Sequence, residues 1–470
     1  MSEPPPPPPP PPSRERDLTQ GPIFPHVRAL AIPTALSLLF ITLYNVTDTL
    51  YAGHLSTEAQ AGLGLGGQLF FAVAALGIGF RIGASSVVGQ LVGAGDMEGA
   101  RTASAQTLLA SLVTTALAVV LGPIVFPPLI ELVAQGRPYG EAAQGYVQLL
   151  LLATPGYIVA YALSGVLQAV GDAQSLARAQ IVATTANVGL NPLLVWGIPG
   201  VLGGLGLDGI AASTVLCQTG VLVYMAWVSF ASSCFRSFHW GRLRPHPGML
   251  MELATQVLPG TVRLLVIAIG GFVAQLWLRA EGEAAVAAYN VGLRLEQLML
   301  LPAIGITGAL LPFTSQNIGA GHPHRVMAAF WQSTGLAMAL LLGGVLAIWT
   351  VGGPIVAWFG AGPEAEAMAL DYLHVESVVF PLFALLFGLQ NLLQGLKRPL
   401  WPLVVGVWRQ GVAVIVFGWL YVEVLGLGAY GLWLTVASGV LTGTGFMSLV
   451  AVPILRALGL PLPPLFRAKG

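Results

Sequence analysis

The stretch IPTALSLLFITLYNVTDTLYAGHL, residues 32–55, decides the fold class, because it is apolar and long enough to cross a bilayer. It nevertheless carries one carboxylate, Asp48, about two thirds of the way along. A charged side chain at the centre of a membrane costs about 3 kcal/mol on insertion scales, so such residues are kept mainly where they have a function. The alternative is an Asp that caps a helix end near the headgroups. The apolar run continues beyond Asp48 through Thr49–Ala52, which favours a membrane-buried carboxylate.

The overall composition is that of an integral membrane protein. The chain has 470 residues, of which 55% are hydrophobic and 9% charged, and its mean hydropathy is +0.78. A soluble domain carries about 25% charged residues. The formal net charge is zero, which argues against nucleic acid as a partner. The two cysteines, Cys217 and Cys234, have neither a metal-site nor a redox spacing.

Long apolar runs separated by short polar turns predict twelve transmembrane helices. The predicted spans are residues 29–52, 60–91, 101–123, 142–169, 176–198, 209–231, 252–279, 285–316, 326–350, 366–395, 400–424 and 430–456. Internal prolines predict kinks in these helices, at Pro33, Pro155, Pro192, Pro259, Pro302 and Pro381. The nine consecutive prolines Pro4–Pro12 predict a disordered tail, to which we assign no function.

The distribution of Lys and Arg predicts that both termini lie in the cytoplasm. With twelve helices and the N-terminus inside, fourteen of the twenty Lys and Arg residues fall on the cytoplasmic face. Only Arg137 and Arg279 fall on the opposite face, and the other four lie within predicted spans. This asymmetry orients the chain by the positive-inside rule.

The two halves of the chain repeat each other at an offset of 226 residues. GQLVGAG (89–95) is matched by SQNIGAG (315–321), and the same offset relates three further pairs, Pro33 with Pro259, Pro155 with Pro381 and Gln168 with Gln394. Six helices per half give both halves the same orientation, so the repeats are parallel, which favours a transporter working by alternating access. The predicted division is a Pro-rich tail (1–27), an N-lobe (28–231), a cytoplasmic linker (232–249), a C-lobe (250–457) and a C-terminal tail (458–470).

These features together resemble the multidrug and toxic compound extrusion (MATE) family of cation-coupled antiporters. The resemblance covers residues 28–456, and the stretches that carry it are the one quoted above, QLVGAGD (90–96), QNIGAGH (316–322), NVGLNPLLVWG (187–197) and GLDGIAASTVLCQ (206–218). It implies a V-shaped bundle of two six-helix lobes. It also implies export of amphipathic organic compounds, driven by inward Na⁺ or H⁺.

The resemblance further implies a cation-coupling site in the N-lobe. Matched residue by residue, that site consists of Asp48, Asn187, Asn191, Thr214 and Tyr146. Some family members have an acidic residue where Asn191 stands. Here only Asp48 can titrate, which weakens any mechanism that needs two carboxylates. Another branch carries acids in helices 7 and 10, whereas the stretches 263–271 and 386–393 have none. The chain therefore looks closer to the DinF-like branch, with coupling confined to the N-lobe.

The depth of these residues supports the same site without the resemblance. Asp48 and Asn191 lie in the outer parts of outward-running helices, while Tyr146 and Thr214 lie near the starts of inward-running ones. Oxygen-bearing groups from four helices are thus expected at one level. Hard cations such as Na⁺ favour oxygen donors, and a lone carboxyl group in a low-dielectric region can also carry a proton. Both ions remain open, and we expect no other metal site.

Each of these residues also has a structural interpretation. Asn187 and Asn191 could form interhelical hydrogen bonds, which are worth about 1 kcal/mol in membranes. Asn191 could also satisfy a backbone carbonyl freed by Pro192. Tyr146 could be an aromatic residue of the membrane interface. Thr214 could likewise have a structural role and no part in a cation site.

A second group of charges falls within the predicted spans of the C-lobe, at Arg263, Arg294, Glu296 and Arg409. Arg294 and Glu296 are two residues apart and therefore face different sides of a helix. In the structural interpretation, Glu296 pairs with Arg263 or Arg409 and locks helices together. In the functional interpretation, these groups line the cavity and contact charged substrate.

The sequence thus predicts a secondary antiporter of the inner membrane that exports small amphipathic organic substrates. We expect no cofactor apart from the coupling ion, H⁺ or Na⁺, and a monomer whose surroundings are membrane lipid. The alternative is a flippase for a lipid-linked precursor, of the same superfamily, which the intramembrane arginines favour. A membrane-embedded enzyme is not favoured, because the spans show no histidine cluster or nucleophile–base arrangement.

Overall fold

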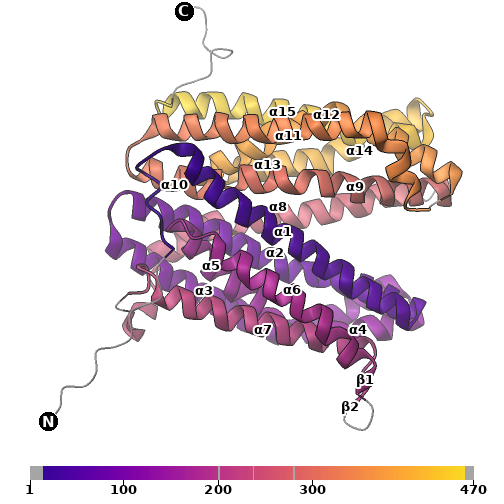
Figure 1. Cartoon of the computed structure of the whole chain (residues 1–470), viewed down its shortest axis with the longest axis horizontal. Coiled ribbons are helices and arrows are strands. Elements are labelled where there is room, and N and C mark those ends of the chain that lie inside the picture. The colour runs from indigo at the N-terminus through magenta and orange to yellow at the C-terminus, as the bar shows by residue number, and fades with distance from the viewer. Residues whose placement is uncertain (1–13, 199–201, 237, 279–280, 361, 461–470) are drawn as a thin grey trace, which may run out of the picture. The chain divides into compact units, whose positions relative to one another are not determined.

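The computed structural model describes residues 14–198, 202–236, 238–278, 281–360 and 362–460 (Figure 1). The proline run Pro4–Pro12 and residues 461–470 of the predicted C-terminal tail lie outside them. Most of the described residues are helical, as predicted. Within that part of the chain the β-structure is one short antiparallel ladder between β1 (Gly197–Ile198) and β2 (Leu202–Gly203).

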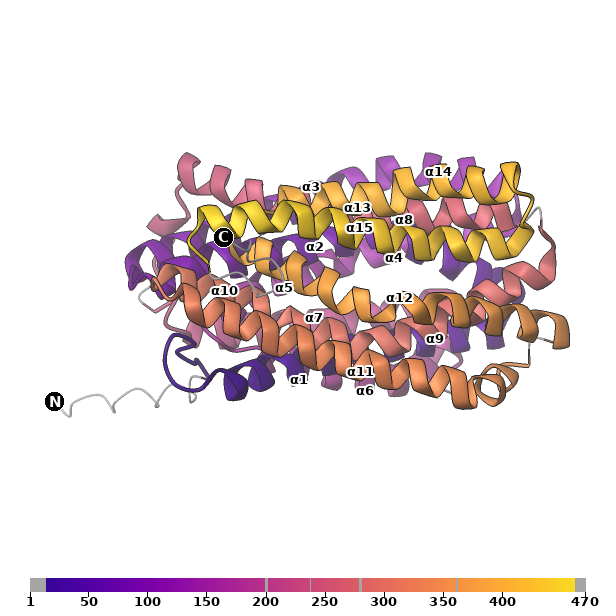
Figure 2. The same ribbon diagram turned by 90° about the horizontal axis from the view of Figure 1, so that it is seen from above.

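Within the described residues, each half of the chain contributes six long helical segments, as the repeat predicts. The first half comprises α1 (Ile23–Leu55), α2 (Thr57–Gly93), α3 (Met97–Ala134), α4 (Pro138–Leu150) followed by α5 (Thr154–Ala169), α6 (Gln174–Val195) and α7 (Leu207–Ala231). The second comprises α8 (Pro247–Leu278), α9 (Glu283–Gly308) followed by α10 (Leu310–Gly319), α11 (Pro323–Ala357), α12 (Pro363–Gly395), α13 (Leu400–Val407) with α14 (Ala413–Gly418), and α15 (Gly428–Ala457). Figure 1 shows α6 beside α7, and Figure 2 shows α11 beside α12.

The surface of these helices suits a lipid environment. In the described part, eleven of the twelve segments are long and apolar enough to cross a membrane. Large apolar side chains such as Ile124 and Leu132 point outward and are 67% and 71% exposed, as expected of a protein whose solvent is hydrocarbon. The one segment that does not meet this criterion, α6, has 22 residues. It is less apolar because Gln180, Asn187 and Asn191 lie within it, and all three are buried.

The internal prolines do not end the helices. Five of the six predicted kink residues lie inside continuous helices: Pro33, Pro192, Pro259, Pro302 and Pro381. Pro155 differs, because a 3₁₀ turn at Leu151–Ala153 separates α4 from α5 just before it. The eleventh segment also departs from regular α-geometry, with π-helical turns at Trp408–Val412 and Trp419–Val424. Turns of this kind are frequent at functional sites.

The repeat extends to individual hydrogen bonds. After α2, the N–H groups of Ala94, Gly95 and Asp96 donate to the carbonyls of Gln90, Val92 and Leu91. After α10, the N–H groups of Ala320, Gly321 and His322 donate to the carbonyls of Gln316, Ile318 and Asn317, which is the same pattern displaced by 226 residues. Gly95 and Gly321 have φ of +76° and +72°. Both turns are therefore glycine-closed helix ends.

The chain separates into two compact units whose boundaries differ from the predicted lobes. The first unit contains Leu43–Leu253 and the residues up to Asp17, and the second contains Leu18–Thr42 and the residues from Ala254 on. The N-lobe was expected to include all of the first helix. Instead, the first half of α1 packs with the second unit, where a side chain on Gly305 of α9 would lie 2.5 Å from Cβ of Ala35.

The predicted linker is held against the first unit by hydrogen bonds and an ion pair to α3. The buried Gln106 of α3 donates through Nε2 to the carbonyls of Arg242 and Arg244, at 2.9 Å each, and accepts from the N–H of His246 at 3.0 Å. Arg242 also forms an ion pair with Glu98 at 2.7 Å. This anchoring explains why the unit boundary falls after Leu253 and not within 232–249.

Candidate functional site

The carboxylate of Asp48 is buried in the first unit and is held by neutral side chains from two other helices. Asn191 donates through Nδ2 to Oδ1 of Asp48 at 2.8 Å, and Asn187 donates to the same oxygen at 3.0 Å. Thr214 of α7 donates to Oδ2 at 3.4 Å. Asp48 is 5% exposed, and its three partners are buried as completely. The structure therefore brings together four of the five residues expected at the N-lobe site.

The spacing on α6 explains how one helix supplies two of these donors. Asn187 and Asn191 are four residues apart and lie on the same helix face. Each amide also donates to the other's carbonyl oxygen, at 3.4 and 3.2 Å. The interhelical hydrogen bonds of the structural interpretation are thus present, and they converge on the carboxylate.

Two further residues belong to this site and were not predicted. Asn187 also donates to Oγ of Ser213 at 3.2 Å, and the hydroxyl of Tyr44 donates to Oγ1 of Thr214 at 3.1 Å. Tyr44 precedes Asp48 by four residues, so its place on the same helix face was a usable signal. Ser213 precedes Thr214 and carried no distinct signal. We call Tyr44, Asp48, Asn187, Asn191, Ser213 and Thr214 the Asp48 cluster.

Tyr146 lies close to the Asp48 cluster without a hydrogen bond to the carboxylate among the described residues. Its side chain is 5% exposed, which does not fit an aromatic residue at the membrane interface. It packs against α2, where a side chain on Gly66 would lie 2.9 Å from Cδ1 of Tyr146. Tyr146 therefore forms a wall of the region and not part of its hydrogen-bond network.

The chemistry of the Asp48 cluster suits a hard cation or a proton. Its oxygens come from one carboxylate, two amides and three hydroxyl groups, which are the donor types that Na⁺ and similar cations prefer. Within the described residues, no Lys or Arg forms an ion pair with Asp48. The carboxylate therefore has no fixed counter-ion and is available to a mobile one.

The C-lobe charges do not form the expected ion pair. Glu296 of α9 accepts a short hydrogen bond from the hydroxyl of Tyr372 on α12, and among the described residues no arginine lies within ion-pair distance of it. Arg263 instead donates to Oε1 of Gln390 at 2.8 Å. Arg409 lies over the ring of Phe383, 5.5 Å from its centroid. Cation–π contacts and neutral partners replace the pairs that we expected.

Arg294 is separate from these groups. Glu296 is 6% exposed, whereas Arg294 points outward and is exposed. The prediction that the two face different sides of the helix is confirmed. Arg294 therefore cannot belong to a buried charge network, which corrects its inclusion in the C-lobe group.

Glu376 of α12 is a buried carboxylate that the sequence reasoning missed. It is fully buried, and neither of its oxygens has a hydrogen-bond partner in the described part of the chain. It lies within electrostatic range of Glu296 and Arg409. The signal was present, because an acid inside a predicted span is itself a candidate functional residue. The stretch that we compared for helix 10, residues 386–393, lies two to three turns further along.

The two units share one packing feature next to their buried acids. In the second unit, a side chain on Gly292 would lie 2.2 Å from Cδ1 of Tyr372. Gly292 and Tyr372 occupy the repeat positions of Gly66 and Tyr146. We call Glu296, Tyr372, Glu376, Phe383 and Arg409 the Glu296 cluster. Four of its members line a cavity of about 90 Å³.

Comparison with known proteins gives consistent matches along the chain. A family model described as MatE matches residues 33–193 and 259–420, one segment in each repeat. The FAD transporter of Shewanella oneidensis is 25% identical over 397 residues, which cover 83% of this chain and 86% of that protein. The probable multidrug resistance protein NorM of Thermotoga maritima is 23% identical over 416 residues, covering 86% and 87%. The multidrug export protein MepA of Staphylococcus aureus is 22% identical and covers 84% and 86%.

Solved structures share the fold. A MOP superfamily transporter from Pyrococcus furiosus, described as having a binding pocket of reverse polarity, superposes with a TM-score of 0.86 at 22% identity. An outward-facing multidrug resistance MATE family transporter superposes with a TM-score of 0.85 at 21% identity. Each match covers 94% of this chain and 98% of the other.

Proposed function

Because the chain belongs to the MatE family, we propose that it is a cation-coupled antiporter that exports amphipathic organic compounds by alternating access. Family membership makes it a membrane transporter and not an enzyme. The observation that carries the coupling proposal is the Asp48 cluster, in which the partners of a buried carboxylate among the described residues are all neutral amides and hydroxyl groups.

The proposed coupling needs only that ion and substrate favour different states of one protein. A proton or Na⁺ entering from outside would bind at Asp48, where it would neutralise the carboxylate. Loss of that charge would change how strongly Asp48 holds the amides of α6 and the hydroxyl of α7. Helix packing around the cluster would then differ between the ion-bound and ion-free states.

The relatives support the proposed substrate class. NorM of Thermotoga maritima and MepA of Staphylococcus aureus are named for multidrug resistance and export. We propose small amphipathic organic compounds as substrates, no cofactor beyond H⁺ or Na⁺, and no nucleic-acid partner. We further propose a monomer in the inner membrane with both termini in the cytoplasm, as the Lys and Arg distribution predicts.

A second candidate substrate class is anionic. The relative in Shewanella oneidensis is named for FAD transport, and Arg409 lines the cavity of the Glu296 cluster with no carboxylate within ion-pair distance among the described residues. A guanidinium group stacked on a ring, as Arg409 is on Phe383, is suited to an anionic aromatic ligand. The same arginine keeps the flippase for a lipid-linked precursor as the alternative function.

The test is ethidium efflux from cells that produce the chain, under separately imposed Na⁺ and pH gradients. Asp48→Asn keeps the size of the side chain and removes its charge, so efflux is expected to fall at least tenfold. Asp208→Asn is the matched control, since Asp208 is exposed in the first turn of α7, and its efflux is expected to equal that of wild type. Dependence on one gradient alone identifies the ion.

Other outcomes separate the alternatives. Efflux that survives Asp48→Asn would overturn coupling at the Asp48 cluster and direct attention to Glu296 and Glu376. If wild type exports no ethidium but exchanges FAD in proteoliposomes, the anionic substrate class replaces the proposed class of amphipathic organic compounds. If it moves neither solute but translocates a fluorescent lipid-linked precursor, the flippase is correct.

A further inference from the structure

Helices α6 and α7 leave a long apolar groove on the exposed surface of the first unit. Its volume is about 520 Å³. Its apolar walls include Val182, Ala186 and Leu190 from α6, and Leu216, Gly220 and Val221 from α7. Positions 182, 186 and 190 of α6, and 216 and 220 of α7, are four residues apart, so each helix contributes one continuous face. Val182 and Leu216 are 67% and 55% exposed, so none of the described residues covers the groove.

The dimensions of the groove match one leaflet of a bilayer. From Arg178 to Leu190 the helix rises by about 18 Å, and half of a hydrocarbon core is about 15 Å. Polar side chains occur at one end only, where Arg178 and Tyr224 line it. That end faces the turn between α5 and α6, on the side that the positive-inside rule assigns to the cytoplasm.

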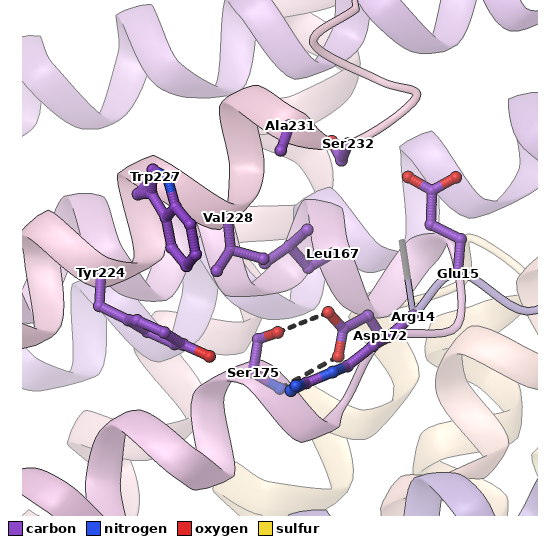
Figure 3. A pocket seen from close by; sticks show the side chains of 10 residues that line it. All are labelled: Arg14, Glu15, Leu167, Asp172, Ser175, Tyr224, Trp227, Val228, Ala231 and Ser232. Carbon is purple, nitrogen blue, oxygen red and sulfur yellow. Dashed lines mark hydrogen bonds between the residues drawn. The ribbon is translucent and has the colours of Figure 1, made fainter. Parts of the chain in front are cut away.

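A smaller pocket adjoins this polar end, and Figure 3 shows the side chains that line it. It has a volume of about 90 Å³, and Tyr224 lines both cavities. Arg14 reaches into it from the segment before α1, and Nη1 of Arg14 is buried with no hydrogen-bond partner among the described residues. Trp227, which also lines the pocket, is 59% exposed. Aromatic residues of this kind gather at the membrane–water boundary.

The two acids of the pocket are already engaged. Asp172 accepts from the N–H groups of Gln174 and Ser175 at 3.0 Å each, and from Oγ of Ser175 at 2.5 Å. Glu15 accepts from the N–H of Ser233 at 2.6 Å. Arg14 and Arg178 have no ion pair within the described residues. Arg178 at the polar end of the groove and Arg14 in the adjoining pocket are therefore both without a carboxylate partner among the described residues.

We propose that the α6–α7 groove and this pocket bind one anionic phospholipid of the cytoplasmic leaflet. An acyl chain lies in the groove, and the phosphate is bound by Arg178 and Arg14. Guanidinium groups bind phosphate oxygens in a bidentate manner, and anionic lipids favour basic residues near the cytoplasmic surface. The apolar walls alone would accept any chain, so the two arginines supply the preference for an anionic headgroup.

The test measures lipid binding to the purified full chain by native mass spectrometry. The probes are dioleoyl phosphatidylglycerol and dioleoyl phosphatidylcholine, which share their chains and differ in charge. Wild type is expected to bind phosphatidylglycerol more tightly. Arg178→Gln and Arg14→Gln are each expected to lower the affinity for phosphatidylglycerol about fivefold. Neither should change the affinity for phosphatidylcholine. Val182→Trp, which fills the groove, is expected to weaken both lipids.

The matched control is Arg236→Gln, since Arg236 is an exposed arginine of the same unit that lines neither cavity. Equal binding of the two lipids by wild type would overturn the proposal, as would an effect of Arg236→Gln as large as that of Arg178→Gln. Displacement of phosphatidylglycerol by ethidium at equal concentration would overturn it in favour of a substrate site. The assay measures binding and not transport. Its result can therefore be interpreted even if the proposed antiport function is wrong.

Discussion

Neutral hydrogen-bond donors hold the carboxylate of Asp48, whereas no donor among the described residues reaches Glu376. Asp48 accepts from Asn187, Asn191 and Thr214, and hydrogen bonds to a charged group each contribute about 1.5–3 kcal/mol. Glu376 is as deeply buried but has no partner for either oxygen in the described part of the chain. The same side-chain chemistry is thus stabilised in one unit and left uncompensated in the other.

Replacing Glu376 should therefore stabilise the fold. A buried polar group without a partner costs about 1–3 kcal/mol, and Glu376→Met removes that cost while keeping the volume similar. We expect a higher melting temperature in detergent. Glu364→Met is the control, since Glu364 is exposed in the first turn of α12 and favours the positive helix end. That control should be slightly less stable than wild type. A melting temperature lowered by Glu376→Met would mean that its carboxyl group has a partner that stabilises it.

At the scale of elements, the turns after α5 and α12 are repeat partners with different residues. Gly171 has φ +85°, and Lys397, at the corresponding position, has φ +55°. Only glycine adopts this region without strain, and other residues are disfavoured by about 1–2 kcal/mol. The second repeat therefore carries backbone strain that the first avoids.

Lys397→Gly should relieve this strain. Because Lys397 also takes part in a further interaction, the informative comparison is with Lys397→Ala, which removes the same side-chain atoms beyond Cβ and keeps the strain. We expect the Gly variant to be more stable than the Ala variant by about 1 kcal/mol, measured by thermal unfolding. Equal stabilities would show that the turn is not strained.

Helix α2 packs so closely on α5 that there is no room for a side chain at Gly77. A side chain on Gly77 would lie 2.0 Å from the carbonyl oxygen of Tyr157, whereas one on Gly64 of the same helix would meet nothing within 4 Å. Gly77→Ala is expected to lower stability by about 2 kcal/mol or more. Gly64→Ala is expected to be neutral or stabilising, because alanine favours helix by up to about 1 kcal/mol. Similar melting temperatures for the two variants would contradict this packing.

For the whole molecule, orientation in the membrane is the property to test. Pro138 and His324 are exposed near the starts of α4 and α11, which the predicted topology places on opposite sides of the membrane. In intact cells, a membrane-impermeant maleimide should label Pro138→Cys and not His324→Cys, and everted vesicles should reverse the result. Native Cys234 is buried, which raises its thiol pKa to about 11, so it stays protonated and unreactive at pH 7. Labelling of both sites in intact cells would exclude the proposed orientation.

The sequence predicted the segments better than the contacts between them. Apolar runs and the 226-residue offset were enough for twelve spans in two repeats. The Asp48 cluster was partly predictable, because the family resemblance and the depth of Asn191 and Thr214 pointed to one level. The pairing of Glu296 with Tyr372 and not with an arginine depends on how α9 packs on α12, and no spacing along the chain encodes that.

The first part of α1 is synthesised well before the residues against which it packs. The segment Leu18–Thr42 packs with residues from Ala254 on, so it leaves the ribosome long before its own unit exists. Synthesis at about 5–20 residues per second puts roughly 10–40 s between the two. During that delay, Thr34 and Ser37, buried in the finished fold, lack their eventual neighbours. If the chain were divided at the linker and expressed as two fragments, the first fragment would still carry Leu18–Thr42, which belongs to the unit formed by the second. The border between the repeats is not the border between the folded units.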